Sequence, residues 1–156
     1  MSGQAEKFRR EPLDGCAGQQ LTAAFRREVV EYYPEWSPAI GPTATPEEFE
    51  APYGAFLIAY TDGKPVGCGG FKRLDVKTAE VKRMFVSPEA RGTGLGRRIL
   101  EQLEDGAQKA GYDVIRLDTG DRLPVAIHLY RSAGYEEIPD YNGNPSASHW
   151  FEKSLR

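Results

Sequence analysis

Apolar residues recur at every fourth position in two stretches of the chain, a spacing that predicts two amphipathic helices. In the first stretch these positions are Leu21, Phe25, Val29 and Tyr33, and in the second they are Leu95, Ile99, Leu103 and Ala107. We expect the first helix to end at Pro34, because proline cannot continue an α-helix. The second is expected to end at Gly111, since glycine tolerates the left-handed backbone of a helix C-terminus.

Three runs of β-favouring residues lie between these helices, separated by turn signals. They cover residues 56–60, 66–74 and 79–86, and the Asp62-Gly63 step favours a hairpin between the first two. These runs predict three sequential antiparallel strands. A brief helix is expected just before them, because Thr45, Pro46 and Glu48 stand in capping-box register.

The rest of the chain supplies the remaining elements. A strand is expected near Phe8, another at 113–118, a helix from Pro124 to Gly134, and a last pair of strands at 135–138 and 149–153. The element order is then β-α-α-β-β-β-α-β-α-β-β. We predict a single α+β domain over residues 1–156. Its mixed sheet is mostly antiparallel, with one parallel crossover within residues 79–134 and helices on both faces.

Composition and charge exclude several classes of protein. The chain has 20 Lys and Arg against 23 Asp and Glu, and this net charge of −3 argues against nucleic acid as a partner. No apolar run approaches the 18 or more residues of a membrane span, and residues 1–11 lack the apolar segment of a signal peptide. Cys16 and Cys68 have no metal-type spacing. We therefore expect no metal, no membrane, a packed Cys68 and a cytoplasmic location.

The charges are unevenly distributed along the chain. Residues 1–50 carry five basic and nine acidic side chains, residues 51–110 carry ten and seven, and residues 111–156 carry five and seven. An anionic ligand is therefore expected against the middle third, and a cationic one near the first.

A glycine-rich turn in that middle third is the clearest candidate site. It reads Arg91-Gly92-Thr93-Gly94-Leu95-Gly96-Arg97-Arg98, between a predicted strand and a predicted helix. Glycines let backbone N–H groups approach a phosphate at a helix N-terminus, and arginines add positive charge. The spacing fits neither the dinucleotide fingerprint G-x-G-x-x-G nor the P-loop. It does fit R-x-x-G-x-G, at Arg91, Gly94 and Gly96.

In this turn the chain resembles the GNAT N-acetyltransferase superfamily, whose pyrophosphate-binding turn has that form. A second segment, residues 126–135 (AIHLYRSAGY), is similar to the family's A-x-x-L-Y-x-x-x-G-[FY] helix, and the likeness runs from about residue 54 to the end. The resemblance implies a GNAT-like fold and transfer of an acetyl group from acetyl-CoA to a primary amine of a small molecule by direct attack. It implies acetyl-CoA contacts from Met84, Phe85, Val86, Arg91, Gly92, Thr93, Gly94, Leu95, Gly96 and Arg97.

The resemblance further implies where the chemistry takes place. The pantetheine arm of the cofactor would enter a splay between the strand around Met84 and the strand at 113–118. Tyr130 matches the tyrosine that often protonates the departing CoA thiolate; its alternative role is that of a core aromatic. Many members carry an asparagine three residues before the alanine of the second motif, where this chain has Leu123.

Glu80 is the candidate general base. It stands eleven residues before Arg91, a spacing at which some members place a base that acts through water. The alternative is a strand carboxylate that pairs with Lys72, Lys82 or Arg83.

The acceptor is less well defined by the sequence. By resemblance the first two helices, the loop between them and the last pair of strands build the acceptor pocket, which implies Tyr32, Tyr33 and Trp36 there. Aromatic walls and nearby carboxylates favour a small cationic amine. A protein N-terminus or lysine, a catalytically silent CoA-binding sensor or partner-binding module, and a general phosphate binder are the alternatives. A homodimer through an exposed sheet edge is compatible with the sequence.

Overall fold

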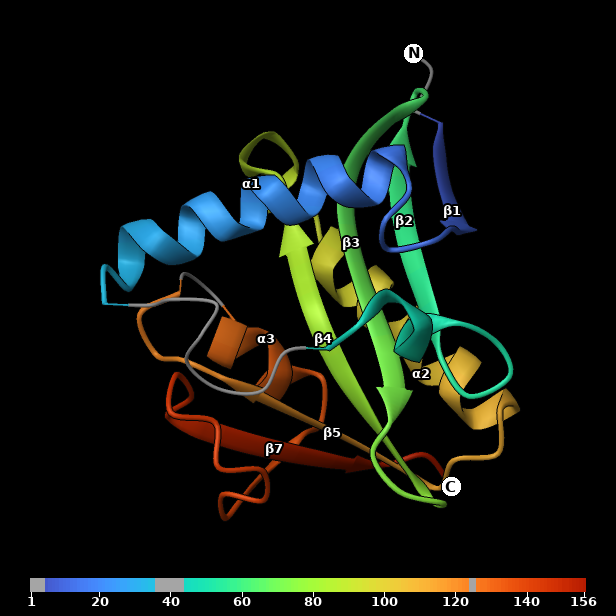
Figure 1. Ribbon diagram of the computed structural model, residues 1–156, viewed down its shortest axis with the longest axis vertical. Helices are drawn as coiled ribbons and strands as arrows, with labels where there is room; N and C mark the ends of the chain where they lie inside the picture. The colour runs from blue at the N-terminus through green and yellow to red at the C-terminus, as the bar shows by residue number, and fades with distance from the viewer. Residues whose placement is uncertain (1–4, 36–43, 124–125) are drawn as a thin grey trace.

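The computed structural model describes residues 5–35, 44–123 and 126–156, and these form a mixed sheet with helices (Figure 1). The strands are β1 (Glu6–Arg10), β2 (Ala55–Thr61), β3 (Lys64–Arg73), β4 (Thr78–Val86), β5 (Val114–Thr119), β6 (Glu136–Ile138) and β7 (His149–Ser154). The helices are α1 (Cys16–Tyr32), α2 (Leu95–Lys109) and α3 (Ala126–Ser132), with short 3₁₀ helices η1 (Pro46–Phe49) and η2 (Pro88–Ala90). The strand order across the sheet is β1-β2-β3-β4-β5-β7-β6.

The predicted fold class and element order are confirmed. Every neighbouring pair of strands is antiparallel except β4 and β5, which are parallel and joined through α2. The predicted brief helix is the 3₁₀ helix η1, whose Thr45 N–H donates to Glu48 Oε1 at 2.9 Å as the capping box requires. The expected start of the last helix at Pro124 lies outside the described residues.

Two apolar clusters lie on opposite faces of the sheet. Successive residues of β2 point to opposite clusters. Leu57 belongs to the cluster that contains the buried face of α2, whereas Ile58 belongs to the cluster beneath α1. Figure 1 shows α1 in front of the sheet and α2 behind it. The glycines of β3 allow the α2 side to pack closely, because a Cβ at Gly67 would lie 2.9 Å from Ile99 Cδ1.

The parallel strands β4 and β5 separate soon after they begin. Residues 78–80 pair with residues 114–116, and the pairing then ends although β4 continues to Val86 and β5 to Thr119. Figure 1 shows the two strands diverging from this point. The predicted splay is therefore present, and it leaves one side of the β4 backbone beyond Glu80 without a neighbouring strand among the described residues.

A β-bulge at Arg83 changes which face of β4 each side chain occupies. Arg83 has a φ of 63°, and the register with β3 shifts between Cys68 and Gly70. Before the bulge Val81 packs in the α2-side cluster, whereas after it Met84 does. The alternation of side chains is thus displaced by one residue at the centre of the splay.

The sheet edges are β1 and β6, and a homodimer through either of them stays a prediction. Within the described ranges, no helix combines the length and the apolar character needed to cross a membrane.

Candidate active site

A cavity of about 390 Å³ lies between the C-terminal end of β4, residues 91–97 and α3; we call it the turn cavity. All the residues predicted to contact acetyl-CoA line this cavity, with the exception of Thr93. The Thr93 hydroxyl instead donates to the carbonyl of Ala90 at 2.6 Å, within the turn. The arrangement brings the predicted cofactor residues together on one concave surface.

The backbone of the turn favours an anion. Gly92 and Gly94 have φ values of 78° and 81°, a left-handed conformation that glycine adopts without strain. The Arg98 N–H donates to the Gly94 carbonyl at 3.1 Å, so the N–H groups of residues 95–97 have no earlier helix carbonyl as partner. The first turn of α2 contains no acidic residue. These N–H groups and the positive end of the helix suit phosphate oxygens.

The three arginines of the turn have different surroundings. Arg91 lines the turn cavity, where its Nε donates to the Val86 carbonyl at 3.0 Å and its guanidinium pairs with Glu28 of α1. Arg97 also lines this cavity and donates to the hydroxyl of Ser132 at 3.2 Å. Arg98 is turned to Glu6 of β1, at 2.7 and 2.8 Å, and does not line the cavity.

A second cavity, of about 240 Å³, occupies the splay between β4 and β5; we call it the fork cavity. Its walls come from both strands, from α1 and from the loop at residues 144–147. Among the described residues, five line both cavities: Phe25, Met84, Leu123, Ala126 and Tyr130. The two cavities therefore adjoin, and apolar Leu123 faces both at the position where many family members carry asparagine.

Tyr130 lies at the junction of the two cavities. Its ring packs edge-to-face on Tyr135, with 5.9 Å between ring centroids, so Tyr130 is a core aromatic, and its role as an acid stays a prediction. Its hydroxyl makes no hydrogen bond to the described residues. Burial, and then the negative charge of Asp118, raise the pKa of Tyr130 above its ordinary value. The hydroxyl is therefore protonated at neutral pH and can donate its proton.

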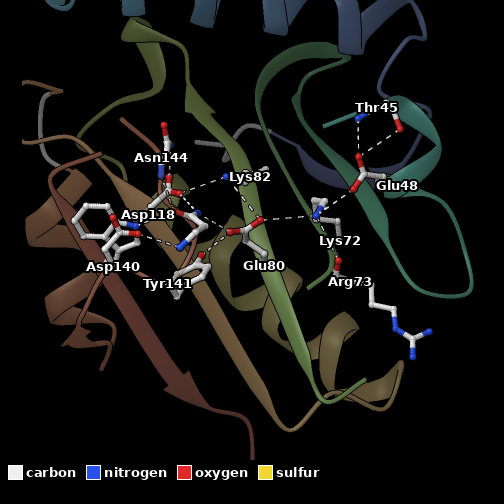
Figure 2. Close-up of polar contacts among 12 residues, drawn as sticks. Thr45, Glu48, Lys72, Arg73, Glu80, Lys82, Asp118, Asp140, Tyr141 and Asn144 are labelled. Atoms are coloured by element: carbon white, nitrogen blue, oxygen red, sulfur yellow. Dashed lines mark hydrogen bonds and ion pairs between the residues drawn. The ribbon is translucent and has the colours of Figure 1, made fainter. Parts of the chain in front are cut away.

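Glu80 is buried at the last position where β4 pairs with β5. Its carboxylate accepts hydrogen bonds from the Tyr141 hydroxyl at 2.6 Å and from Asn142 Nδ2 at 3.1 Å (Figure 2). Lys82 and Lys72 are its ion-pair partners, at 3.7 and 3.9 Å. Arg83, the third partner considered from the sequence, is not paired with it. Glu80 itself lines neither cavity, because Tyr141 and Asn142 are held against it.

Asp118 of β5 lies at the candidate site, although the sequence analysis did not name it. It lines the fork cavity, pairs with Lys82 at 3.4 Å and accepts from Asn144 Nδ2 at 3.3 Å. Figure 2 shows Asp118 and Glu80 on either side of the contacts that Lys82 makes. The alternation along β5, with buried Ile115 and Leu117, puts Asp118 on the opposite face, and this signal was available in the sequence.

The residues predicted for the acceptor pocket do not all lie at the fork cavity. Tyr33 lines the fork cavity, and its hydroxyl accepts a hydrogen bond from the Arg122 N–H at 2.9 Å. Tyr32 is exposed and lines neither cavity. Trp36 lies outside the described residues. Cys68 is buried, as expected, and burial raises the pKa of its thiol to about 12.

Comparison with known proteins identifies the family. Residues 22–135 match the acetyltransferase (GNAT) family model. An IAA acetyltransferase of Azospirillum brasilense is 41% identical over 104 residues, which are 64% of this chain and 67% of that protein. The N-alpha-acetyltransferase RimI of Mycobacterium tuberculosis is 32% identical over 100 residues, 62% of this chain and 61% of that protein. The matched regions thus span about two thirds of these curated relatives.

Solved structures agree with the fold. A GNAT-family acetyltransferase of Staphylococcus aureus superposes with a TM-score of 0.73 at 22% identity, covering 97% of this chain and all of the other. The PaiA N-acetyltransferase of Thermoplasma acidophilum, solved in complex with coenzyme A, gives 0.71 at 18% identity, covering 96% and 99%. On the family match and this shared fold, the chain belongs to the acetyltransferase (GNAT) family, a family of acyltransferases.

Proposed function

We propose that this protein transfers the acetyl group of acetyl-CoA to a primary amine of a small molecule. One observation carries the proposal: the turn cavity and the fork cavity adjoin, with Tyr130 in the walls of both. The backbone of the glycine-rich turn, which suits a phosphate, lines the turn cavity, and charged side chains line the fork cavity. A thioester at the junction would meet an amine that enters from the opposite side.

The chemistry needs few groups. The amine nitrogen attacks the thioester carbonyl carbon, the carbon–sulfur bond breaks, and the sulfur takes the proton of Tyr130. An acceptor that arrives as an ammonium first gives one proton to solvent, which frees its nitrogen lone pair. The new carbon–nitrogen bond leaves an extra proton on nitrogen, which passes to a carboxylate directly or through water, and exchange with solvent then returns a proton to the Tyr130 phenolate. The unpaired side of β4 around Met84, Phe85 and Val86 offers backbone N–H groups that could polarise the carbonyl.

Two carboxylates are candidates for that proton. Glu80 acts as the base in the proposal, and Asp118 is the carboxylate that meets the amine, because of the two only Asp118 lines the fork cavity. Asn142 donates to both carboxylates, and Lys82 pairs with both. We propose that the pair works as one unit, with Asp118 orienting the amine and Glu80 receiving the proton through water.

A thiol-release assay tests the function. Purified protein and acetyl-CoA are mixed with one class of amine in each reaction. The classes are polyamines, amino acids, aminoglycosides, and lysine or N-terminal peptides. We expect CoA release with a small amine, and an acetylated product about 42 Da heavier by mass spectrometry, the mass of an acetyl group less a proton. Binding of acetyl-CoA without release for any amine would favour the sensor alternative. Equal binding of ATP and acetyl-CoA would favour a general phosphate binder.

A protein or peptide N-terminus is the second candidate acceptor. The relative named N-alpha-acetyltransferase RimI favours it, whereas the relative named IAA acetyltransferase does not. The peptide arm of the same assay separates the candidates, because a peptide acceptor predicts release with N-terminal peptides and not with free amino acids.

A further inference from the structure

The fork cavity contains a cation for which the described residues supply no counter-charge. Three charged side chains line this cavity: Lys82, Arg83 and Asp118. Lys82 and Asp118 pair with each other at 3.4 Å. Within the described ranges, Arg83 has no carboxylate at ion-pair distance. Every Asp and Glu of the sequence lies in those ranges, because segments 1–4, 36–43 and 124–125 contain no acidic residue.

Arg83 is set at an unusual point of the backbone. It occupies the β4 bulge with a φ of 63°, a left-handed conformation that strains a non-glycine residue. The bulge turns Arg83 out of the regular alternation of β4. The direction of the Arg83 side chain therefore depends on the bulge.

The surroundings of the guanidinium leave most of its hydrogen-bonding capacity unused within the described ranges. It is partly buried and donates one long hydrogen bond, of 3.4 Å, to the Ala44 carbonyl. A guanidinium carries five N–H donors. Burial, and then the like charge of Arg26 on α1, lower the pKa of Arg83. Enclosing a cation without a partner costs free energy, and an anion from a ligand would offset that cost.

We propose that Arg83 binds a carboxylate of the acceptor, so that the acceptor is a small amino acid rather than a plain amine. This inference rests on the proposed acetyl transfer and names its substrate class. Asp118 and Arg83 then receive the two charged groups of one molecule, the ammonium and the carboxylate. Phe25, Val29 and Leu117 give the same cavity an apolar wall, which suits an apolar amino-acid side chain. Planar guanidinium and planar carboxylate groups match in a bidentate pair.

The test uses matched acceptors. Leucine, methionine and phenylalanine are each compared with their amides, which keep the amine and the side chain but lack the negative charge. We expect kcat/KM for at least one amino acid to exceed that of its amide by tenfold or more. In Arg83→Gln this preference for the amino acid over its amide falls at least tenfold, through the KM of the amino acid. Comparing variants cancels the different intrinsic reactivities of the amines.

Two further variants keep the result interpretable. Arg83→Gly removes the guanidinium at a backbone conformation that glycine adopts freely, so it guards against misfolding of Arg83→Gln. Arg73→Gln on β3 removes an arginine that lies over Tyr53, with 4.4 Å from guanidinium carbon to ring centroid, and lines neither cavity. We expect Arg83→Gly to lose the preference for the carboxylate and Arg73→Gln to keep it.

A binding measurement separates this inference from the proposed function. The N-acetyl derivatives of the three amino acids and of their amides are titrated into the CoA-saturated protein by calorimetry. A carboxylate preference that Arg83→Gln abolishes would support the inference even if no acceptor turned over, and the proposed function would then fail alone. Equal affinity for every acid and its amide would overturn the inference. So would turnover of O-phosphoethanolamine in place of the amino acids, because Arg83 would then bind a phosphate.

Discussion

At the residue scale, the position of Tyr130 suits both the core packing that the structure shows and the proton donation that we propose. The ring packs in the core, while the hydroxyl lies where the turn cavity and the fork cavity adjoin. Because burial raises its pKa, the side chain holds its proton at every pH where the protein would work. This is the state that a departing thiolate requires.

Replacing this hydroxyl should therefore slow turnover without weakening cofactor binding. We expect Tyr130→Phe to lower kcat at least tenfold, about 1.4 kcal/mol of activation free energy, with the Kd for acetyl-CoA unchanged. The matched control is Tyr135→Phe, in the same cluster, whose hydroxyl donates to Glu104 at 2.8 Å and lines neither cavity. Steady-state kinetics decide between the roles. Full activity of Tyr130→Phe would leave Tyr130 with packing alone.

Asp118 and Glu80 should not contribute equally to catalysis. Asp118→Asn is expected to lower kcat/KM by more than Glu80→Gln does, and each by at least tenfold, because Asp118 lines the cavity and Glu80 lies behind it. The control is Glu152→Gln on β7, which loses a pair with Arg116 of 2.7 Å outside both cavities. Kinetics and circular dichroism are measured for all three. Wild-type activity of Glu80→Gln would show that Glu80 is a structural partner of Tyr141.

The cysteines give a prediction that depends on pH. Burial raises the pKa of Cys68 from 9.0 to about 12, so its thiolate is scarce in the folded protein at pH 8, whereas Cys16 is exposed. We expect a thiol reagent at pH 8 to modify one cysteine quickly in the native protein and both after unfolding. The buried neutral thiol also contributes stability that is full below pH 9 and is lost as the pH rises toward 12. Rapid modification of both native cysteines would contradict this account.

At the scale of elements, we expect acetyl-CoA binding by the turn before α2 to depend on its backbone more than on its side chains. Gly94 combines a φ of 81° with a place on the turn cavity. We expect Gly94→Glu to weaken acetyl-CoA binding at least 100-fold, because it adds bulk and negative charge where phosphate should lie. Isothermal titration with acetyl-CoA measures the loss.

A matched control for this substitution exists elsewhere in the fold. Gly63 has the same φ of 81° but lies in the β2–β3 hairpin, where an added Cβ would meet none of the described atoms within 4 Å. Gly63→Glu therefore carries the same backbone strain away from both cavities. It should leave acetyl-CoA binding within twofold. Equal loss in both variants would mean that strain, and not the phosphate site, explains the effect at Gly94.

Regular elements were the part of the structure that sequence could predict. The spacing of apolar residues at every fourth position located α1 and α2, because this spacing is a local property of the sequence. The splay between β4 and β5 was expected from the family resemblance. The charged residues in and beside the fork cavity were only partly predictable. Glu80 was found by its spacing to Arg91, but Arg83 was not singled out. A bulge displaces the period-two alternation, and nothing in the local sequence marks where that displacement falls.

For the whole molecule, the distribution of charge along the chain agrees with the turn cavity, which Arg91 and Arg97 of the basic middle third line, but it does not account for the pairing of the acidic first third. The acidic first third favoured a cationic ligand. In the fold, however, Glu28 pairs with Arg91 and Glu35 pairs with Arg122 at 2.6 Å. Carboxylates of the first third are thus neutralised by arginines from later segments, while Arg83 lacks such a partner among the described residues. Charge counts over a segment do not include these long-range pairs.

The arrangement of the whole molecule leads to one central claim: acetyl-CoA lies along the turn cavity and ends at the junction with the fork cavity. The most direct measurement is a crystal structure of the protein with CoA bound. We predict the pyrophosphate against the backbone N–H groups of residues 92–97, and the sulfur within hydrogen-bonding distance of the Tyr130 hydroxyl. CoA bound with its pyrophosphate away from this turn, or with its sulfur remote from Tyr130, would contradict the account.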